Sequence, residues 1–174
     1  MTKTDSEQKI DYKVVEIRRV AKVTEGGKRL KIRAVVVVGN HQGRVGIGIA
    51  KGDDFSDAVS KAKKAAEKNM ISVPIINGTV PYSVKAKIGA AEILIKPAKS
   101  GKGLVAGSAA RNVLALAGYK DVSAKILGVT KNVLLNTFVT LKALSQYQDY
   151  DKKKYIKELL KGKKLVSQSE SVDK

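Results

Sequence analysis

The sequence contains no cysteine and no tryptophan, and it has one histidine among 174 residues. The lack of cysteine excludes a disulfide framework, a thiolate nucleophile and a cysteine-based zinc or iron–sulfur site. Apolar runs do not exceed five residues, so we expect no membrane-spanning helix. The first residues include Asp5 and Glu7 and have no apolar stretch, which predicts neither a secretory signal nor a transit peptide. These absences favour a soluble intracellular protein.

Acidic residues are also scarce, so the charge balance is strongly basic. The chain has 34 Lys and Arg against 16 Asp and Glu, a formal net charge of +18. Residues 13–70 and 71–145 carry +8 each, so the excess lies in two stretches that look folded. A thermophile-like surface would balance lysine with glutamate, and this one does not. With 43% hydrophobic residues the chain can build a core, and its charge indicates a polyanionic partner, nucleic acid above all.

The first basic stretch predicts three strands followed by a helix. Alternation of apolar and polar residues predicts the strands at 14–23, 30–38 and 45–49. Turns that contain glycine separate them, at 24–28 and 39–43. Gly46 and Gly48 fill one face of the third strand and leave a flat surface for close packing. The helix is expected to begin after Asp53 or Asp54 and to end near Asn69.

The second basic stretch follows a linker at 73–78 and predicts the order β-β-α-β-α. Its strands are expected at 80–88, 91–96 and 121–128, and its helices at 106–117 and 131–145. The inward face of the last helix is predicted to contain Val133, Leu134, Phe138, Leu141 and Leu144. The remaining residues, 146–174, are predicted to be a basic tail with one helix that carries Tyr155, Ile156, Leu159 and Leu160.

Two motifs imitate ligand sites, but helix starts explain them better. Gly101-x-Gly103-x-x-Ala106 matches a dinucleotide fingerprint, yet no acidic residue closes the next predicted strand. Asp53-Asp54-x-x-Asp57 imitates a metal-binding pattern, although few other carboxylates are available to converge on an ion. His41 stands in a turn with no serine or aspartate partner nearby in the sequence. We therefore predict no catalytic residue, no metal and no cofactor.

The turn at Gly26-Gly27 is flanked by basic residues on both sides. They are Arg18, Arg19, Lys22, Lys28, Arg29, Lys31 and Arg33. A two-stranded basic arm with a low-profile tip can enter a groove of folded RNA and contact phosphates of both strands. An ordinary hairpin with solvated lysines explains these residues equally well. Tyr12 and Phe55 are the only aromatic residues before the linker, which favours recognition of shape and phosphate over base stacking.

Ordered motifs occur in both stretches. The first contains Gly26-Gly27-Lys28 and Ala34-x-Val36-Val37-Val38-Gly39-Asn40-x-x-Gly43-Arg44-Val45-Gly46-x-Gly48. The second contains Lys96-Pro97-Ala98, Gly101-x-Gly103-Leu104-Val105-Ala106-Gly107 and Arg111-x-Val113-Leu114-x-x-Ala117-Gly118. The tail adds Ile156-x-Glu158-Leu159-Leu160-x-Gly162. Together these motifs resemble the bacterial-type small-subunit ribosomal protein S-five family, from about residue 11 to residue 145.

The resemblance implies an α+β fold of two domains. A double-stranded-RNA-binding-like β-β-β-α domain is expected at 11–74, and an S-five second-domain-like β-β-α-β-α domain at 75–146. A flexible N-terminus is expected at 1–10 and a basic tail at 147–174. The implied protein is a non-enzymatic structural constituent of the small ribosomal subunit that stabilises the head relative to the body. With ribosomal proteins S-four and S-twelve it contributes to translational accuracy.

The resemblance also implies partners and sites. The expected partners are small-subunit (16S-type) rRNA, ribosomal proteins S-four and S-eight, and messenger RNA at the entry channel, with no membrane and no small-molecule substrate. We predict that rRNA is bound by Arg18, Arg19, Lys22, Gly26, Gly27, Lys28, Arg29, Arg44, Lys51, Lys61, Lys64 and Lys68. Gly107 and Arg111 are expected at a protein interface that faces S-four. The chain departs from the family pattern at Glu25, Ile32 and Ser108, where the family commonly has a basic residue, an aromatic residue and a glycine.

A second interpretation is a free-standing RNA chaperone or double-stranded-RNA-binding protein. It shares the charge and the first domain, but it does not need the motifs of the second stretch. The S-five interpretation predicts a ribosome-bound cytoplasmic protein, and a copy encoded by a plastid or mitochondrion stays open.

Overall fold

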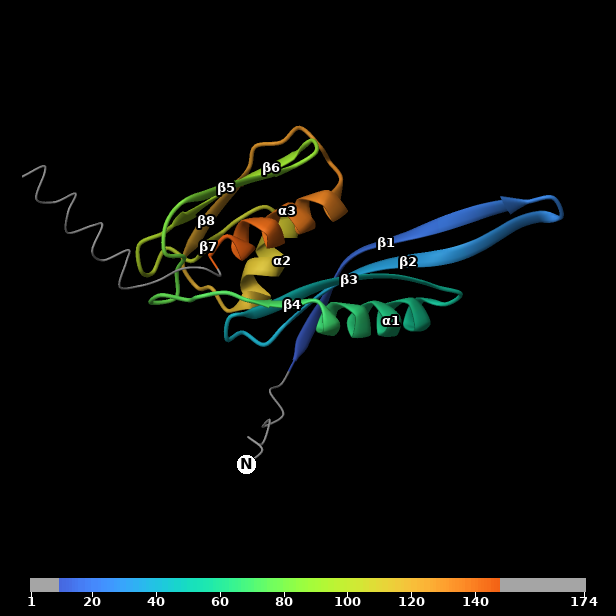
Figure 1. Ribbon diagram of the computed structural model, residues 1–174, viewed down its shortest axis with the longest axis horizontal. Coiled ribbons are helices and arrows are strands. Elements are labelled where there is room, and N and C mark those ends of the chain that lie inside the picture. The colour runs from blue at the N-terminus through green and yellow to red at the C-terminus, as the bar shows by residue number, and fades with distance from the viewer. Residues whose placement is uncertain (1–9, 148–174) are drawn as a thin grey trace, which may run out of the picture.

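The computed structural model describes residues 10–147, which form two four-stranded sheets and three helices (Figure 1). The first sheet is antiparallel, in the order β1 (Asp11–Thr24), β2 (Gly27–Gly39), β3 (Arg44–Gly52) and β4 (Met70–Ser72). Helix α1 (Phe55–Lys68) covers one of its faces. The predicted β-β-β-α order is confirmed, and β4 is an additional edge strand that was not predicted. The helix predicted in the tail lies outside the described residues.

Two glycines of β3 bring α1 close to the sheet, as predicted. A Cβ atom at Gly48 would lie well under 3.0 Å from the carbonyl oxygen of Ala62, and one at Gly46 would meet that of Ala66 in the same way. Side chains larger than hydrogen therefore do not fit at these positions while the helix stays in place. The buried face of α1 consists of small residues, Ala58, Val59, Ala62 and Ala66.

The second sheet has the order β5-β6-β8-β7. Its strands are β5 (Val84–Ile88), β6 (Ala91–Pro97), β7 (Leu104–Val105) and β8 (Val122–Ile126). The first three in space are antiparallel, and β7 pairs with β8 in parallel. Helix α2 (Ser108–Ala117) lies between β7 and β8 in the chain, and α3 (Val133–Ser145) follows β8. The predicted β-β-α-β-α order is confirmed, with every element except β6 shorter than expected, and β7 is a two-residue strand that was not predicted.

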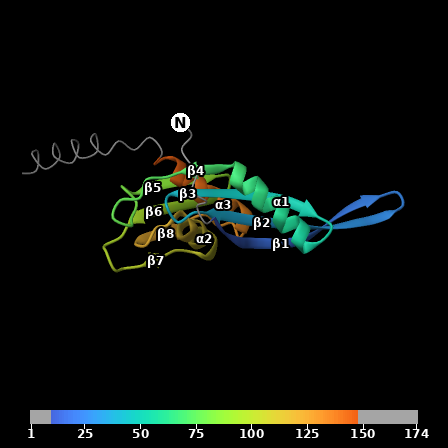
Figure 2. The same ribbon diagram turned by 90° about the horizontal axis from the view of Figure 1, so that it is seen from below.

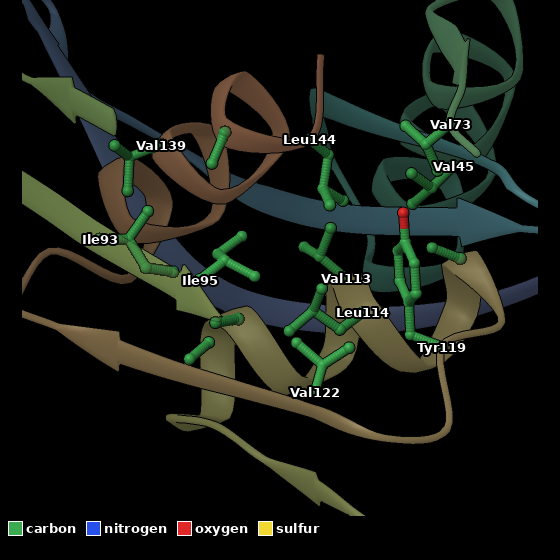
Figure 3. Close-up of a cluster of buried hydrophobic side chains, with 14 of the residues drawn as sticks. Val45, Val73, Ile93, Ile95, Val113, Leu114, Tyr119, Val122, Val139 and Leu144 are labelled. Carbon is green, nitrogen blue, oxygen red and sulfur yellow. The ribbon is translucent and has the colours of Figure 1, made fainter. Parts of the chain in front are cut away.

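Helices α2 and α3 lie between the two sheets, which share one hydrophobic core (Figure 1). In the view from below, the two helices overlap the strands (Figure 2). The first sheet contributes Val35, Val37, Val45 and Ile47. The second sheet and the helices contribute Ile93, Ile95, Val113, Leu114, Val122 and Leu144 (Figure 3). Because close-packed interiors resist deformation, this core fixes the position of one sheet relative to the other.

The inward face of α3 was predicted wrongly in part. Of the five predicted residues only Leu144 is fully buried, whereas Leu134, Phe138 and Leu141 are half-buried at the edge of the core. The buried positions of α3 are Asn136, Thr137, Val139, Thr140, Ala143 and Leu144. The hydroxyls of both threonines donate to carbonyl oxygens four residues earlier, at 2.7 Å each. These bonds remove the cost of burying a polar group, so hydrophobicity alone points to the wrong face.

Strands β1 and β2 continue past the last β2–β3 pair, Ile32–Gly52, as a two-stranded projection (Figure 1). We call residues 18–33, which include the base of this projection beside β3, the arm. The strands pair without a gap from Arg18–Arg33 to Thr24–Gly27. Most arm residues are exposed, but β2 is buried on both faces from Ala34 onward. The arm therefore extends from a strand that is anchored in the core.

Candidate nucleic-acid interface

The cross-strand register gives the arm two different faces. Directly opposed residues of an antiparallel pair share a face, and successive residues alternate between faces. The pairs Arg18–Arg33, Val20–Lys31 and Lys22–Arg29 therefore lie on one side. We call Arg18, Lys22, Arg29, Lys31 and Arg33 the cationic face of the arm. All five of these side chains come from three successive cross-strand pairs on the same face, and Val20 is the sixth member. Positive charge is therefore concentrated on this face of the arm.

The opposite side of the arm is mainly apolar. It carries Ala21, Val23, Leu30 and Ile32, together with Arg19 and Lys28. Val23 is 70% exposed and Leu30 is 64% exposed, so this side presents apolar surface to solvent. Arg19 and Lys28 were predicted to act with the other basic residues, but the register places them on this second side. The arm can therefore contact phosphates with one face and less polar surface with the other.

Lys51 extends the cationic face onto the body of the protein. It pairs with Arg33 across β2 and β3, so both side chains belong to the same side of the sheet. A concavity of about 330 Å³ lies here, and its lining includes Lys22, Arg29, Lys31 and Lys51. Four cations around one open hollow attract an anion and leave it accessible to solvent.

Two acidic side chains order the root of the cationic face. Glu16 accepts from Arg18 at 2.8 Å and from Arg33 at 3.0 Å, and its own side chain is only 9% exposed. Asp53 lies 3.2 Å from Lys31. Within residues 10–147, Lys22, Lys28 and Arg29 form no ion pair. The cations toward the tip are thus available to an external anion, while those at the root are held in place.

The tip of the arm is a short turn built on glycine. Gly27 has a φ of 137°, which side chains rarely allow, whereas a Cβ atom at Gly26 would meet nothing within 4 Å. The hydroxyl of Thr24 donates to the carbonyl oxygen of Gly27 at 3.0 Å. A tip of this kind has little bulk, as predicted from the sequence.

The other predicted RNA-binding residues lie apart from the arm. Arg44 begins β3 at the end of the sheet opposite the arm, because β3 runs antiparallel to β2. Lys61, Lys64 and Lys68 are exposed along α1. A hydrogen bond to Asp57, 2.7 Å long, raises the pKa of Lys61. The structure therefore brings together Arg18, Lys22, Arg29 and Lys51, places Arg19 and Lys28 on the other side of the arm, and leaves Lys61, Lys64 and Lys68 on α1.

Lys31 and Arg33 belong to the cationic face although they were not among the predicted RNA-binding residues. The sequence signal for them is strand alternation, because every second residue of a strand faces the same side. Lys31 and Arg33 stand two and four positions after Arg29 on β2 and therefore share its face. Applying that alternation to each strand separately would have found them. It does not find Lys51, since the pairing of Lys51 with Arg33 depends on the register between β2 and β3.

The predicted protein-interface residues lie at the start of α2. Gly107 is the N-cap residue, and Arg111 is exposed one turn later. A Cβ atom at Gly107 would approach the Cδ1 atom of Ile126 to 3.0 Å. Arg111 makes no ion pair within residues 10–147, so its charge is available to a partner.

The two ligand-like motifs have local structural roles. The backbone N–H of Gly103 donates to a carboxylate oxygen of Asp121 at 2.7 Å, so the glycine loop is tied to the start of β8. Asp54 is the N-cap of α1 and Asp57 lies in its first turn. Over residues 10–147, no group of three or more potential metal ligands occurs, and no helix is long and apolar enough to cross a membrane.

Comparison with known proteins defines the class. Residues 10–74 match the family "Ribosomal protein S5, N-terminal domain", and residues 86–158 match "Ribosomal protein S5, C-terminal domain". The chain belongs to the ribosomal protein S5 (S-five) family, which confirms the resemblance of the motifs and the two-part α+β fold. It is a small-subunit ribosomal protein and thus a component of the ribonucleoprotein that carries out translation.

The chain is also similar to individual proteins of the genus Thermotoga. The chain is 44% identical over 139 residues to small ribosomal subunit protein uS5 of Thermotoga maritima, covering 79% of this chain and 78% of that protein. It is 43% identical over 142 residues to the same protein of Thermotoga neapolitana, covering 82% and 79%.

Proposed function

We propose that this chain binds small-subunit rRNA through the cationic face of the arm and Lys51. The observation that carries the proposal is the register of β1 and β2, which aligns five cations on one side of a projecting hairpin. Lys51 adds a sixth beside them, while the nearby carboxylates are those of Glu16 and Asp53 and that of Glu25 at the tip. Such a surface replaces the counterions of an RNA backbone, which is the main source of affinity for a nucleic acid.

The shape of the arm supports recognition of folded RNA. A ribbon of two strands with a glycine tip is thin enough to lie in a groove and present cations to phosphates on both sides. Aromatic residues are absent from the arm, so stacking on single-stranded bases is not its mode of binding. Lysine and arginine side chains on an ordered ribbon instead bind phosphates whose spacing matches theirs.

The function follows from connecting this arm to a rigid body. Because one core holds both sheets, an RNA segment bound by the arm has a fixed orientation relative to whatever contacts α2 and the second sheet. In the small subunit, this arrangement would stabilise the head relative to the body. Gly107 and Arg111 would then contact S-four, and with S-four and S-twelve the protein would contribute to accuracy. Ribosomal protein S-eight and messenger RNA at the entry channel are the remaining proposed partners.

Alanine substitution of Lys22, Arg29 and Lys51 together tests the proposal. These side chains are exposed, so the thermal unfolding curve should stay nearly unchanged. Reconstituted small subunits should show impaired head–body assembly by sucrose-gradient sedimentation and chemical probing. A matched variant, alanine at Lys99, Lys102 and Lys131, removes the same charge elsewhere and should assemble normally. Normal assembly of the arm variant would refute the proposal.

Salt dependence gives an independent measure of the same contacts. If about eight phosphates are contacted, affinity for an rRNA transcript should fall with salt with a log–log slope of roughly −6 to −7. A free-standing RNA chaperone would share such a slope but would not sediment with small subunits, so the gradient separates the two interpretations.

A further inference from the structure

The second sheet has an open face that carries four lysines. Residues of β5, β6 and β8 that point toward α2 and α3 are buried, among them Ala86, Ile93, Ile95 and Ala124. The alternate residues face away from both helices, which Figure 1 shows on one side of this sheet. We call these alternate residues the outer face; they are Lys85, Lys87, Glu92, Leu94, Lys96, Ser123 and Lys125.

The register arranges the outer face in rows across the strands. Leu94 pairs with Lys85 on one side and with Lys125 on the other. Because neighbouring strands lie about 4.8 Å apart, the backbone positions of these two lysines are about 10 Å apart, with an apolar residue between them. Lys96 pairs with Ser123 in the next row, and Lys87 pairs with Glu92 in the row before. The four lysines thus cover three strands.

One carboxylate lies on the outer face, and it is already paired. Glu92 forms an ion pair with Lys85, and the hydrogen bond from Lys85 lowers the pKa of Glu92. The other three lysines, at positions 87, 96 and 125, are exposed and form no ion pair within residues 10–147. A net charge of about +3 on a flat, open sheet is unnecessary for the fold, because the core lies on the opposite side.

We propose that the outer face is a second RNA-contact surface, which binds the sugar-phosphate backbone of structured RNA. Charge complementarity selects the occupant: lysines without arginine or aromatic residues suit diffuse attraction to phosphates and not base reading or stacking. Flatness over three strands suits an extended polyanion, and the chain belongs to a ribonucleoprotein. This surface does not depend on the arm, which projects from the other end of the molecule (Figure 1).

The position of the outer face gives the proposal a structural consequence. The arm and the outer face lie at opposite ends of a body whose two sheets share a hydrophobic core. Two RNA segments bound at these ends would therefore be held at a fixed separation and orientation. The protein would act as a rigid spacer between them as well as a source of positive charge.

Site-specific cross-linking tests which partner covers the outer face. Because the chain has no cysteine, Ser123→Cys creates a single attachment point for a photoreactive aryl azide with little change of volume. Thr24→Cys places the same probe at the tip of the arm. After reconstitution of the full chain into small subunits and irradiation, the probe at residue 123 should give an adduct with rRNA that ribonuclease removes.

The two probes separate the possible outcomes. An adduct of residue 123 with a protein, or no adduct while residue 24 cross-links to rRNA, would overturn the second surface and leave the arm proposal standing. An rRNA adduct from residue 123 alone would support the second surface and contradict the arm proposal.

Removal of charge provides a second test, which does not require reconstituted small subunits. Alanine at Lys87, Lys96 and Lys125 leaves the Lys85–Glu92 pair in place. Binding to a small-subunit rRNA transcript should show a salt slope shallower by roughly 2 to 3, since three cations are lost. The control variant with alanine at Lys99, Lys102 and Lys131 should keep a slope closer to that of the parent. An unchanged slope for the outer-face variant, with an unchanged thermal unfolding curve, would also overturn the proposal.

Discussion

The Nδ1 atom of His41 lies 2.9 Å from the carbonyl oxygen of Ala115, which is 74 positions later in the chain. Next to it, the backbone N–H groups of His41 and Gly43 donate to the carbonyl oxygens of Leu116 and Ala117, at 3.0 and 2.9 Å. The turn between β2 and β3 therefore binds three successive carbonyl groups at the C-terminal end of α2, of which that of Ala115 also accepts from the N–H of Gly118. This contact joins the two stretches that the sequence presents as separate units.

Replacing His41 by alanine should weaken this contact between the β2–β3 turn and α2. The variant loses the hydrogen bond to Ala115 and the contact with Asp11, in which Nε2 lies 3.3 Å from the carboxylate. We expect the free energy of unfolding in urea to fall by about 1 kcal/mol, the usual net value of one hydrogen bond. Gln42→Ala, at an exposed neighbouring position, is the control and should change stability little. Equal stability of the two variants would contradict a structural role for the imidazole.

Close packing of α1 against β3 predicts a large effect of one added methyl group. Gly48→Ala would place a Cβ atom against the carbonyl oxygen of Ala62, so the helix must shift away from the sheet. We expect a loss of about 2 to 3 kcal/mol, as for other overpacked interiors, measured by denaturant unfolding. Gly26→Ala introduces the same group at the tip of the arm, where nothing lies within 4 Å, and should cost far less. Similar losses for both would show that glycine is not required by packing.

Two buried tyrosines predict instability at high pH. Burial raises the pKa of Tyr119 and of Tyr147 above the ordinary value of 10, because a phenolate is poorly solvated inside the protein. The folded state then binds more protons than the unfolded state above pH 10. The stability that the neutral rings contribute is complete below pH 10 and is lost as the pH rises beyond it.

The variant with phenylalanine at both positions isolates this effect. It should be less stable at pH 7, because the hydroxyls donate to the carbonyl oxygens of Pro74 and Tyr82 at 2.9 and 2.8 Å. Its stability should then decline less between pH 10 and pH 11 than that of the parent, as followed by urea unfolding. Lysines also titrate in this pH range and affect all variants alike. Tyr12→Phe, at a half-exposed ring, is the control, and its stability should decline with pH as that of the parent does. Parallel curves for the parent and the double variant would disprove the assignment.

Arg111 provides a test of the proposed accuracy role. Its guanidinium lies near the start of α2, where the helix dipole disfavours a cation, so a partner carboxylate would explain its position. If that partner belongs to S-four, Arg111→Ala should raise miscoding in a readthrough reporter by several-fold while the free protein keeps its melting temperature. Arg111→Lys retains the charge and should restore part of the accuracy. Unchanged fidelity in the alanine variant would remove the residue from the proposed interface.

Long periodic segments were predictable from the sequence, whereas short elements were not. The arm strands and α1 were found because each repeats its pattern several times between glycine or aspartate signals. Strand β7 has only Leu104 and Val105, which gives no period, and it exists because both residues meet β8 in parallel. A two-residue strand of this kind forms only through pairing with a strand distant in sequence, so no local sequence pattern predicts it.

The candidate interface was predictable in composition but not in arrangement. The basic residues around Gly26 identified the arm, yet only the register assigned Lys28 to one side and Arg29 to the other. His41 had no predicted partner, because Asp11 and Ala115 approach it only after the chain has folded. Contacts between distant residues are set by packing of the whole core, which a single sequence does not display.

The core that joins the two sheets also affects how the newly made chain folds. Val35, Val37, Val45 and Ile47 belong to the first sheet, but their covering residues include those of α2, which is synthesised later. The nascent first sheet therefore has one apolar side without its cover until Ser108–Ala117 has emerged. A fragment that stops at residue 74 would keep that side bare and be prone to aggregate, so the native state is completed only by the later half of the chain.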